Sequence, residues 1–445
     1  MSETDLQTYV DELVTWATST LVGDEVLLAS FSGEDSDFVR FNKSAVRQAG
    51  SVRQRSISLD LVAGARHTTA ELQLAQDLDV DRARVADSLR SLREQRALVP
   101  EDPYLLFATE GPSTERTEAA DLPDPEAAVS DIVDAGSGQD LVGIYASGTT
   151  HRGFASSTGQ RHWHSSGSFN LDWSFYLRAD KAAKNLYAGT SWDDTEFDRK
   201  VDWSRQQLAA LDRDPIDLAR GGYRTFLAPA AMLEIMDMLA WGGFGLKSHR
   251  TKQTPLLRML TEGASFHPSV RISEDIAGGT AAPFQEQGFA RPDEVVLIDS
   301  GALAGTLVSP RSAQEYDVET NGAASHESPE SVHLAAGDLP TDDVLAELGT
   351  GLYVGNLWYL NFSDRAACRT TGMTRFATFW VDGGEIVAPV NVLRFDDSAF
   401  SLLGDRLVGL TDRTELLPDV LTYQQRSTAS ARLPGALVEE MTYTL

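Results

Sequence analysis

Two histidines flank a tryptophan at residues 162–164, and their chemistry depends on the local backbone. In a β-strand, residues two apart project from the same face, so His162 and His164 would present their imidazoles together. Such a pair can bind a divalent metal, although a solvated or substrate-lining strand is the more common role. We predict that His162, Trp163 and His164 contribute to substrate binding.

A second group of basic side chains lies between residues 247 and 267 of an otherwise acidic chain. Clustered positive charge can hold a carboxylate or meet a neighbouring subunit, and a solvated face is an equally simple interpretation. From this group we predict Lys252 as a further substrate-binding residue. The group consists of Lys247, His249, Arg250, Lys252, Arg258 and His267.

Three other side chains are weaker candidates. Glu234 and Asp237 lie three residues apart in a segment with helical periodicity, but a carboxylate pair without a histidine binds zinc poorly. A metal site built from Asp237, His162 and His164 stays open as an alternative. Cys368 is the single cysteine of the chain, and we expect it to be a small buried residue.

The apolar pattern predicts the elements that must position these residues. The clearest helical periodicity covers residues 69–98, with Thr69 as a candidate N-cap and an Asp-rich interruption at 77–81 that suggests two helices. The turn at Asp382, Gly383 and Gly384 predicts a hairpin. Further helices are expected at 4–21, 195–218, 230–241 and 396–405, short strands at 25–31, 38–42, 45–51 and 56–61, and a long polar loop at 320–334.

From this pattern we predict an α+β fold, in which an N-terminal mixed α/β region precedes a mainly antiparallel β C-terminal domain. We expect three parts: an N-terminal α+β domain at 1–110, a central β-rich region with a helix at 111–220, and a C-terminal β-rich domain at 221–445.

Composition excludes several classes of protein. The 445 residues carry a net charge of −28, from 66 acidic and 38 basic side chains, so binding to nucleic acid through a basic surface is not expected. One cysteine excludes an intramolecular disulfide framework and any multi-cysteine metal site. The N-terminal residues have neither a basic start nor a long apolar core, and no apolar run approaches the roughly 18–20 residues of a membrane span. We predict a cytoplasmic protein with no membrane segment.

Four short motifs follow one another in the last hundred residues. They are Gly349-Thr350-Gly351-Leu352, Thr371-Gly372, Gly384-Glu385-Ile386 and Pro389-Val390. In order and spacing, this stretch resembles the C-terminal domain of the TldD/PmbA family of metallopeptidase subunits. The resemblance extends over nearly the whole chain and is weakest at 100–140.

The resemblance implies a metal site that this sequence lacks. Catalytic members of the family carry His-Glu-x-x-x-His on a helix near the start of the C-terminal domain, with a cysteine ligand close to the C-terminus. Here the corresponding positions fall near Pro229, Ala230 and Glu234, and residues 421–445 contain no cysteine. We therefore predict no catalytic residue and no metal ligand in this chain, which resembles the non-catalytic, TldE/PmbA-like branch.

This likeness implies a function within a complex. The chain would be the non-catalytic subunit of a heterodimeric peptidase. It would close a chamber shared with a TldD-like, zinc-carrying partner and bind unfolded or short peptides, or peptide-like natural-product precursors. The alternative is a homodimeric peptide-binding or regulatory protein without peptidase activity of its own.

Overall fold

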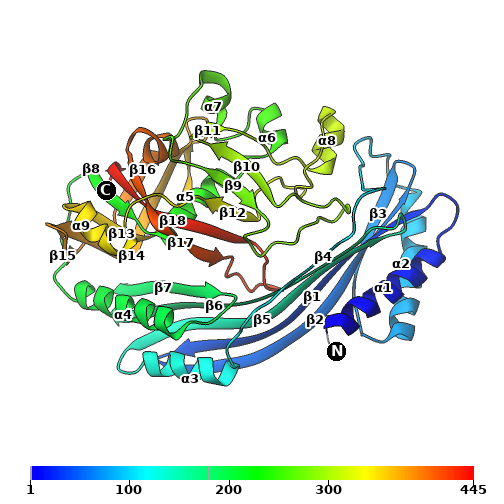
Figure 1. Cartoon of the computed structure of the whole chain (residues 1–445), viewed down its shortest axis with the longest axis horizontal. Coiled ribbons are helices and arrows are strands. Elements are labelled where there is room, and N and C mark those ends of the chain that lie inside the picture. Colours follow the sequence, from blue (N-terminus) through cyan, green and yellow to red (C-terminus); the bar gives the residue numbers. More distant parts are fainter. Residues whose placement is uncertain (1–2, 179–180) are drawn as a thin grey trace.

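A long curved sheet forms the base of the molecule, and the C-terminal half packs on one of its faces (Figure 1). The computed structural model describes residues 3–178 and 181–445. The fold is α+β, with a mixed N-terminal region and a sheet-rich C-terminal domain, as predicted. The main helices are α1 (Glu3–Ser19), α2 (Leu78–Arg96), α3 (Pro125–Ala135), α4 (Asp194–Leu211), α5 (Pro229–Ala240), α6 (Leu246–Arg250), α7 (Leu257–Glu262), α8 (Pro310–Tyr316) and α9 (Val344–Leu348).

In the described part of the chain, the N-terminal sheet has seven strands in the order β3-β2-β1-β5-β6-β4, with β7 paired to β6. Its central strands are unusually long, and their runs of consecutive buried residues indicate that both faces of the sheet are covered over much of its length. The strands are β1 (Val26–Asn42), β2 (Ala45–Ala63), β3 (Arg66–Gln73), β4 (Thr114–Glu118), β5 (Asp140–Ser156), β6 (Arg161–Arg178) and β7 (Lys181–Gly189).

The C-terminal sheet has eleven strands within the described residues, and most of its pairings are antiparallel. Strand β18 pairs with both β16 and β8, so β8, β13, β14, β16 and β18 close into a ring. The strands are β8 (Gly221–Leu227), β9 (Ile272–Asp275), β10 (Glu294–Asp299), β11 (Ala302–Leu303), β12 (Ser331–Leu334), β13 (Gly351–Asp364), β14 (Arg369–Asp382), β15 (Glu385–Pro389), β16 (Arg394–Ser398), β17 (Leu407–Pro418) and β18 (Ser430–Tyr443).

Several predicted elements are confirmed by the structure. Helix α1 occupies the expected segment, α5 lies within one residue of the predicted helix at 230–241, and the Asp382-Gly383-Gly384 turn joins β14 to β15. Gly383 and Gly384 both have positive φ, as this tight connection requires.

The helix predicted to begin at Thr69 is wrong. Residues around Thr69 belong to β3, which pairs with β2, because that pairing buries one face of the segment. Helix α2 begins only after Asp77, whose side chain accepts hydrogen bonds from the N–H groups of Asp79 and Val80 at 3.0 and 3.2 Å. The Asp-rich stretch is therefore the N-cap of a single helix.

Several other predicted elements differ in length or type. The strands expected at 38–42, 45–51 and 56–61 are parts of β1 and β2, whose pairing is continuous apart from one bulge near Phe41. Helix α4 ends at Leu211, seven residues before the predicted end. The segment expected as a helix at 396–405 begins as β16, paired with β14, and continues as a π-helical turn at Ser401–Asp405. At the end of the polar loop predicted for 320–334, Ser331–Leu334 is strand β12.

The three predicted parts do not correspond to three separate sheets. Strands on both sides of residue 110 belong to the same N-terminal sheet, whereas β8 begins the C-terminal sheet at residue 221. The division at 110 and 220 stays a prediction.

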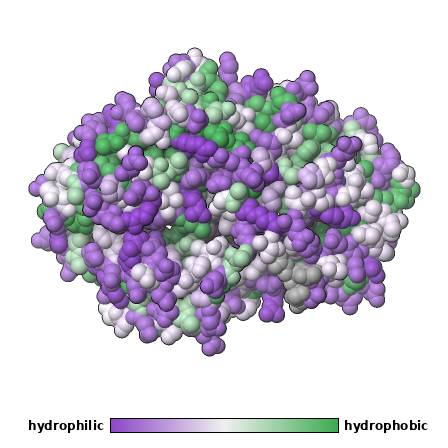
Figure 2. All heavy atoms as spheres, in the orientation of Figure 1, coloured by the Kyte–Doolittle hydropathy of each residue, from purple (hydrophilic) through white to green (hydrophobic). Residues whose placement is uncertain are grey.

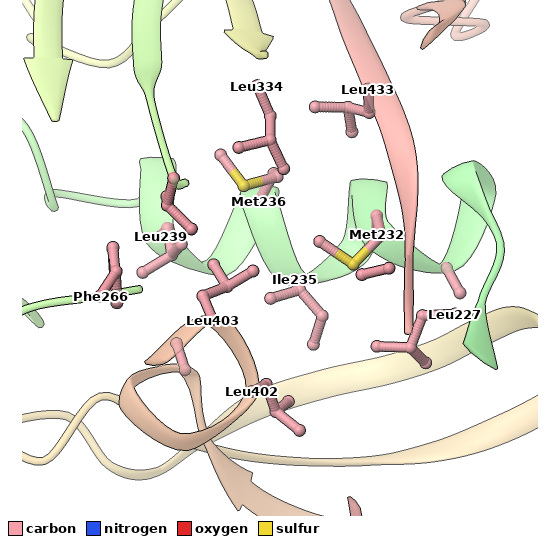
Figure 3. Packing of buried hydrophobic residues seen from close by; sticks show 14 of the residues in the cluster. Leu227, Met232, Ile235, Met236, Leu239, Phe266, Leu334, Leu402, Leu403 and Leu433 are labelled. Atoms are coloured by element: carbon pink, nitrogen blue, oxygen red, sulfur yellow. The ribbon is translucent and has the colours of Figure 1, made fainter. Parts of the chain in front are cut away.

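The main core of the C-terminal half forms around α5 (Figure 3). Met232, Ile235, Met236 and Leu239 project from one side of the helix toward side chains of the surrounding strands and turns. Their buried partners include Leu227, Phe266, Leu334, Leu402, Leu403 and Leu433. This apolar face fixes the rotation of α5 about its axis, because turning the helix would bring its polar side into the core.

The two halves share a second core and are also joined by polar contacts. Phe169 and Trp173 of the N-terminal sheet pack in one cluster with Tyr353, Phe379 and Leu437 of the C-terminal half. The segment after β17 also reaches the N-terminal sheet. There the buried Arg426 guanidinium donates to the carbonyl oxygens of Gly148 and Ser168 at 3.3 and 3.1 Å, and the Arg426 N–H donates to Glu34.

Hydrophilic residues cover most of the face seen in Figure 2, as expected for a chain of net charge −28. Among the described residues, no helix has the length and apolarity needed to cross a bilayer.

Replacing Met236 by Ala should destabilise the C-terminal half, because this fully buried side chain lies at the centre of the core around α5. We expect a loss of about 2–5 kcal/mol, measured by urea-induced unfolding. Leu98→Ala is the matched control, since Leu98 is 86% exposed, and it should change stability by less than about 0.5 kcal/mol. Equal effects of the two substitutions would contradict this assignment of the core.

Candidate active site

Helix α5 begins where β8 ends, and both backbone hydrogen bonds and side-chain packing hold it in place. The Ala228 N–H donates to the Val354 carbonyl of β13 at 3.0 Å, and the Ala228 carbonyl accepts the first helical hydrogen bond, from Met232, at 2.9 Å. Pro229 occupies the first turn, where its missing N–H costs nothing. Because the apolar face is buried, the second turn of α5 directs Glu234 to the opposite side.

A cavity of about 1120 Å³ lies on this opposite side of α5. One wall comes from the N-terminal half, through β6, β7 and α4, and the other comes from β8, α5, β13 and β17. Trp203, Phe226 and Tyr353 give the cavity an aromatic surface, with Tyr353 stacked on Phe226 at 5.6 Å and edge-on to Trp203 at 5.8 Å. The site is therefore concave, partly apolar and built from both halves of the molecule.

Charged side chains also line the cavity, and nearly all of them are paired. Among the described residues, seven carboxylates and four basic groups line it, and each basic group has an acidic partner. Six of the carboxylates have a basic partner, whereas the Glu234 carboxylate makes neither an ion pair nor a hydrogen bond with the described residues. The pairs are Asp172–Lys184, Glu196–Arg199 and Glu415–Lys200 at 2.7 Å, Asp202–Arg205 at 3.1 Å, Asp412–Arg413 at 3.7 Å, and Asp342–Arg413.

The surroundings of Glu234 favour its protonated form. Partial removal of water, reinforced by the negative charge of Asp237, raises the Glu234 pKa to about 7, although Lys184 opposes this shift. The pKa of Asp237 is raised to about 6, mainly by reduced solvation and further by Asp419. Glu234 can therefore exchange a proton near neutral pH, or accept a cation that restores its charged form.

The residues around α5 do not fit a zinc ion. At the positions of the expected metal motif stand Pro229, Ala230 and Glu234, so the cavity offers one unpaired carboxylate and no imidazole. Across residues 3–178 and 181–445, no three His, Cys, Asp or Glu side chains converge to hold a metal ion. Asp237, His162 and His164 therefore do not form the alternative metal site.

Cys368 is buried in the turn before β14, with 1% of its surface exposed, as expected for a small buried residue. Burial raises the pKa of its thiol to about 12, so it stays protonated at neutral pH.

The three residues predicted from the 162–164 motif lie in β6 and do not line the cavity beside α5. His162 and His164 are buried, and their Nε2 atoms lie 3.1 and 3.3 Å from the carbonyl oxygens of Gly288 and Thr280 in the C-terminal half. Burial lowers the pKa of both imidazoles, that of His164 to about 4. Trp163 points to the other face, where it stacks on Phe31 at 5.5 Å. Their proposed role in substrate binding stays a prediction.

Lys252 also lies away from this cavity, in an exposed turn after α6 where its φ is positive. Neighbours in the basic cluster make separate local contacts: His249 Nε2 lies 2.6 Å from the Gly243 carbonyl oxygen, and Arg258 pairs with Glu262 at 3.0 Å. The substrate-binding role of Lys252 likewise stays a prediction.

Sequence reasoning did not identify most residues of the cavity. They come from segments around 172–207, 226–234, 341–356 and 411–420, which the fold brings together. One local signal was present: Glu234 falls on the polar side of a mainly apolar helix, at the expected position of a histidine.

Comparisons with known proteins agree with the fold. The sequence profile of the PmbA/TldA metallopeptidase C-terminal domain matches residues 220–445. The chain therefore belongs to the PmbA/TldD family. No curated protein sequence matches this chain.

Three solved structures share the fold over almost the entire chain. TldE from Thermococcus kodakarensis is 13% identical, with a TM-score of 0.75, and the match covers 98% of this chain and 100% of that one. A Thermotoga maritima protein described as a candidate modulator of a DNA gyrase is 14% identical, with a TM-score of 0.76, covering 99% and 100%. A Bacteroides thetaiotaomicron protein described in similar words is 14% identical, with a TM-score of 0.75, covering 100% of both chains.

Replacing Glu234 by Gln should stabilise the protein at about pH 8 and leave it nearly unchanged at about pH 5. The folded-state pKa of Glu234, about 7, is above the ordinary value, so the folded state holds an extra proton between the two values. Stability contributed by this group is therefore lost as pH rises through about 7. We expect a gain of about 1–3 kcal/mol at the higher pH, measured by urea-induced unfolding.

Asp202→Asn is the matched control, because Asp202 lines the same cavity but is paired with Arg205. Its effect should not grow with pH over this range. A Glu234→Gln variant that is equally stable to the wild type at both pH values would contradict the raised pKa.

Proposed function

We propose that this chain is the non-catalytic, TldE/PmbA-like subunit of a heterodimeric metallopeptidase. The observation that carries the proposal is that α5 and a large cavity stand where the family likeness places the metal motif, yet Pro229, Ala230 and Glu234 replace its side chains. A hydrolytic zinc site needs about three protein ligands and an open position for water. One unpaired carboxylate does not meet this requirement.

In this proposal the metal, expected to be zinc, belongs to a TldD-like partner chain. That metal would supply the hydrolytic chemistry of the complex. This chain closes the shared chamber and helps to hold the substrate. The structural likeness to a TldE supports this division of roles at the level of the fold.

The proposed substrates are unfolded or short peptides, or peptide-like natural-product precursors, processed in the cytoplasm. The cavity supports this class by its size, since about 1120 Å³ exceeds the range of roughly 300–1000 Å³ typical of small-molecule pockets. Extended binding through main-chain hydrogen bonds would accept many side chains with little selectivity. A role in specialised metabolism is one variant of this proposal.

Co-expression with a TldD-like chain from the same genome tests the subunit role. We expect a stable complex in size-exclusion chromatography that contains about one zinc per heterodimer and cleaves an unfolded peptide. This chain alone should be metal-free and inactive. Replacing the first histidine of the partner's motif by Ala should abolish both the zinc and the cleavage, whereas Glu234→Gln in this chain should leave the zinc content unchanged.

Two outcomes would contradict the proposal. Peptide cleavage or stoichiometric metal binding by the isolated chain would contradict the assignment as non-catalytic. A homodimer that ignores every TldD-like chain tested would instead favour a homodimeric peptide-binding or regulatory protein.

A further inference from the structure

Among the described residues that line the cavity beside α5, one carboxylate has no charged partner. Each of its four basic groups is already paired with a carboxylate of the cavity wall. Glu234 is the lining carboxylate left without an ion pair or hydrogen bond among the described residues. An incoming anion would therefore have to break an existing pair, whereas an incoming cation meets an unpaired carboxylate.

The pairing of the neighbouring charged side chains distinguishes between the kinds of cation that could bind at Glu234. A divalent metal needs several oxygen ligands, but the other carboxylates of the wall are held by basic partners, and Lys184 acts on Glu234 from β7. A guanidinium can pair with one carboxylate through two of its five donors, which leaves three donors to be satisfied elsewhere in the cavity. A primary ammonium is a compact charge that one carboxylate can neutralise.

The aromatic wall fits the same ligand. Trp203, Phe226 and Tyr353 line the cavity that contains Glu234. Aromatic faces attract cations and also cover the apolar stem next to an ammonium group. A cavity that holds both a carboxylate and aromatic side chains is therefore suited to an amine that carries an apolar or peptide body.

We propose that this cavity binds the primary ammonium group of a peptide, with Glu234 as its counter-ion and the aromatic wall beside it. The group is either the peptide N-terminus or a lysine side chain, which share this chemistry. The inference names the substrate feature recognised at the proposed peptide-binding site, and it rests on the proposed function.

The test measures binding of three hexapeptides of Ala and Gly by isothermal titration calorimetry. All three have an amidated C-terminus; one has a free N-terminus, one is N-acetylated, and one is N-acetylated with a single central Lys. The protein is the full chain, measured alone and in complex with the TldD-like partner inactivated at its motif. We expect the free N-terminus, the Lys peptide or both to bind at least tenfold more tightly than the acetylated peptide. The arm that gains affinity identifies the source of the ammonium.

Substitutions of Glu234 test whether its carboxylate causes the preference for ammonium-bearing peptides. Glu234→Gln should remove at least tenfold of the affinity for ammonium-bearing peptides and leave the acetylated peptide unchanged, whereas Glu234→Asp, which keeps the charge, should restore part of it. Asp202→Asn, a paired carboxylate of the same wall, should change affinity less than threefold. Circular dichroism spectra establish that each variant is folded.

Equal binding of the acetylated peptide and the ammonium-bearing peptides, or no effect of Glu234→Gln in the folded variant, would overturn the inference. Failure here is distinguishable from failure of the subunit role. A zinc-containing, active heterodimer without ammonium preference would leave the subunit role standing and reject the inference. A chain that prefers ammonium peptides but associates with no TldD-like partner would reject the subunit role alone.

Discussion

The rest of the site depends on the burial of one face of α5. Met232, Ile235, Met236 and Leu239 are packed by strands and turns of the C-terminal half, and an apolar side of this size cannot be turned toward water without a large loss of stability. Because the rotation of the helix is fixed, the direction of the side chains on its other face is fixed as well. Glu234 therefore faces the cavity because of residues that never touch the cavity.

Because of this constraint, some residues of α5 maintain the fold, while others determine the chemistry of the cavity. Residues at 229, 230 and 234 can change without disturbing the core, since the packing comes from other positions of α5. A family can thus keep the helix, its buried face and the surrounding ring of strands while the groups that face the cavity change. This chain retains the scaffold and carries Pro229, Ala230 and Glu234 on it.

The elements that could be predicted from the sequence are those whose local residue pattern matches their local structure. Helix α5 was predictable because its apolar residues repeat with helical spacing, and the β14–β15 hairpin because Asp382, Gly383 and Gly384 allow a tight turn. The error at Thr69 arose because apolar spacing is ambiguous in short segments, and pairing with β2 decided the outcome. The pairing of remote charges, such as Lys200 with Glu415, has no local signature, so the cavity could not be derived from the sequence.

Arg426 contributes to the stability of the cavity walls, although it is not one of the residues that line the cavity. Its buried guanidinium joins the segment after β17 to two strands of the N-terminal sheet, and separating the halves would leave that charge and its acceptors without partners. This contact therefore helps to hold the two halves, and with them the two walls of the cavity, together. A peptide bound as we propose would enter a preorganised slot, so little of its binding free energy would be spent on closing the protein, and its own loss of chain entropy would be the main opposing term.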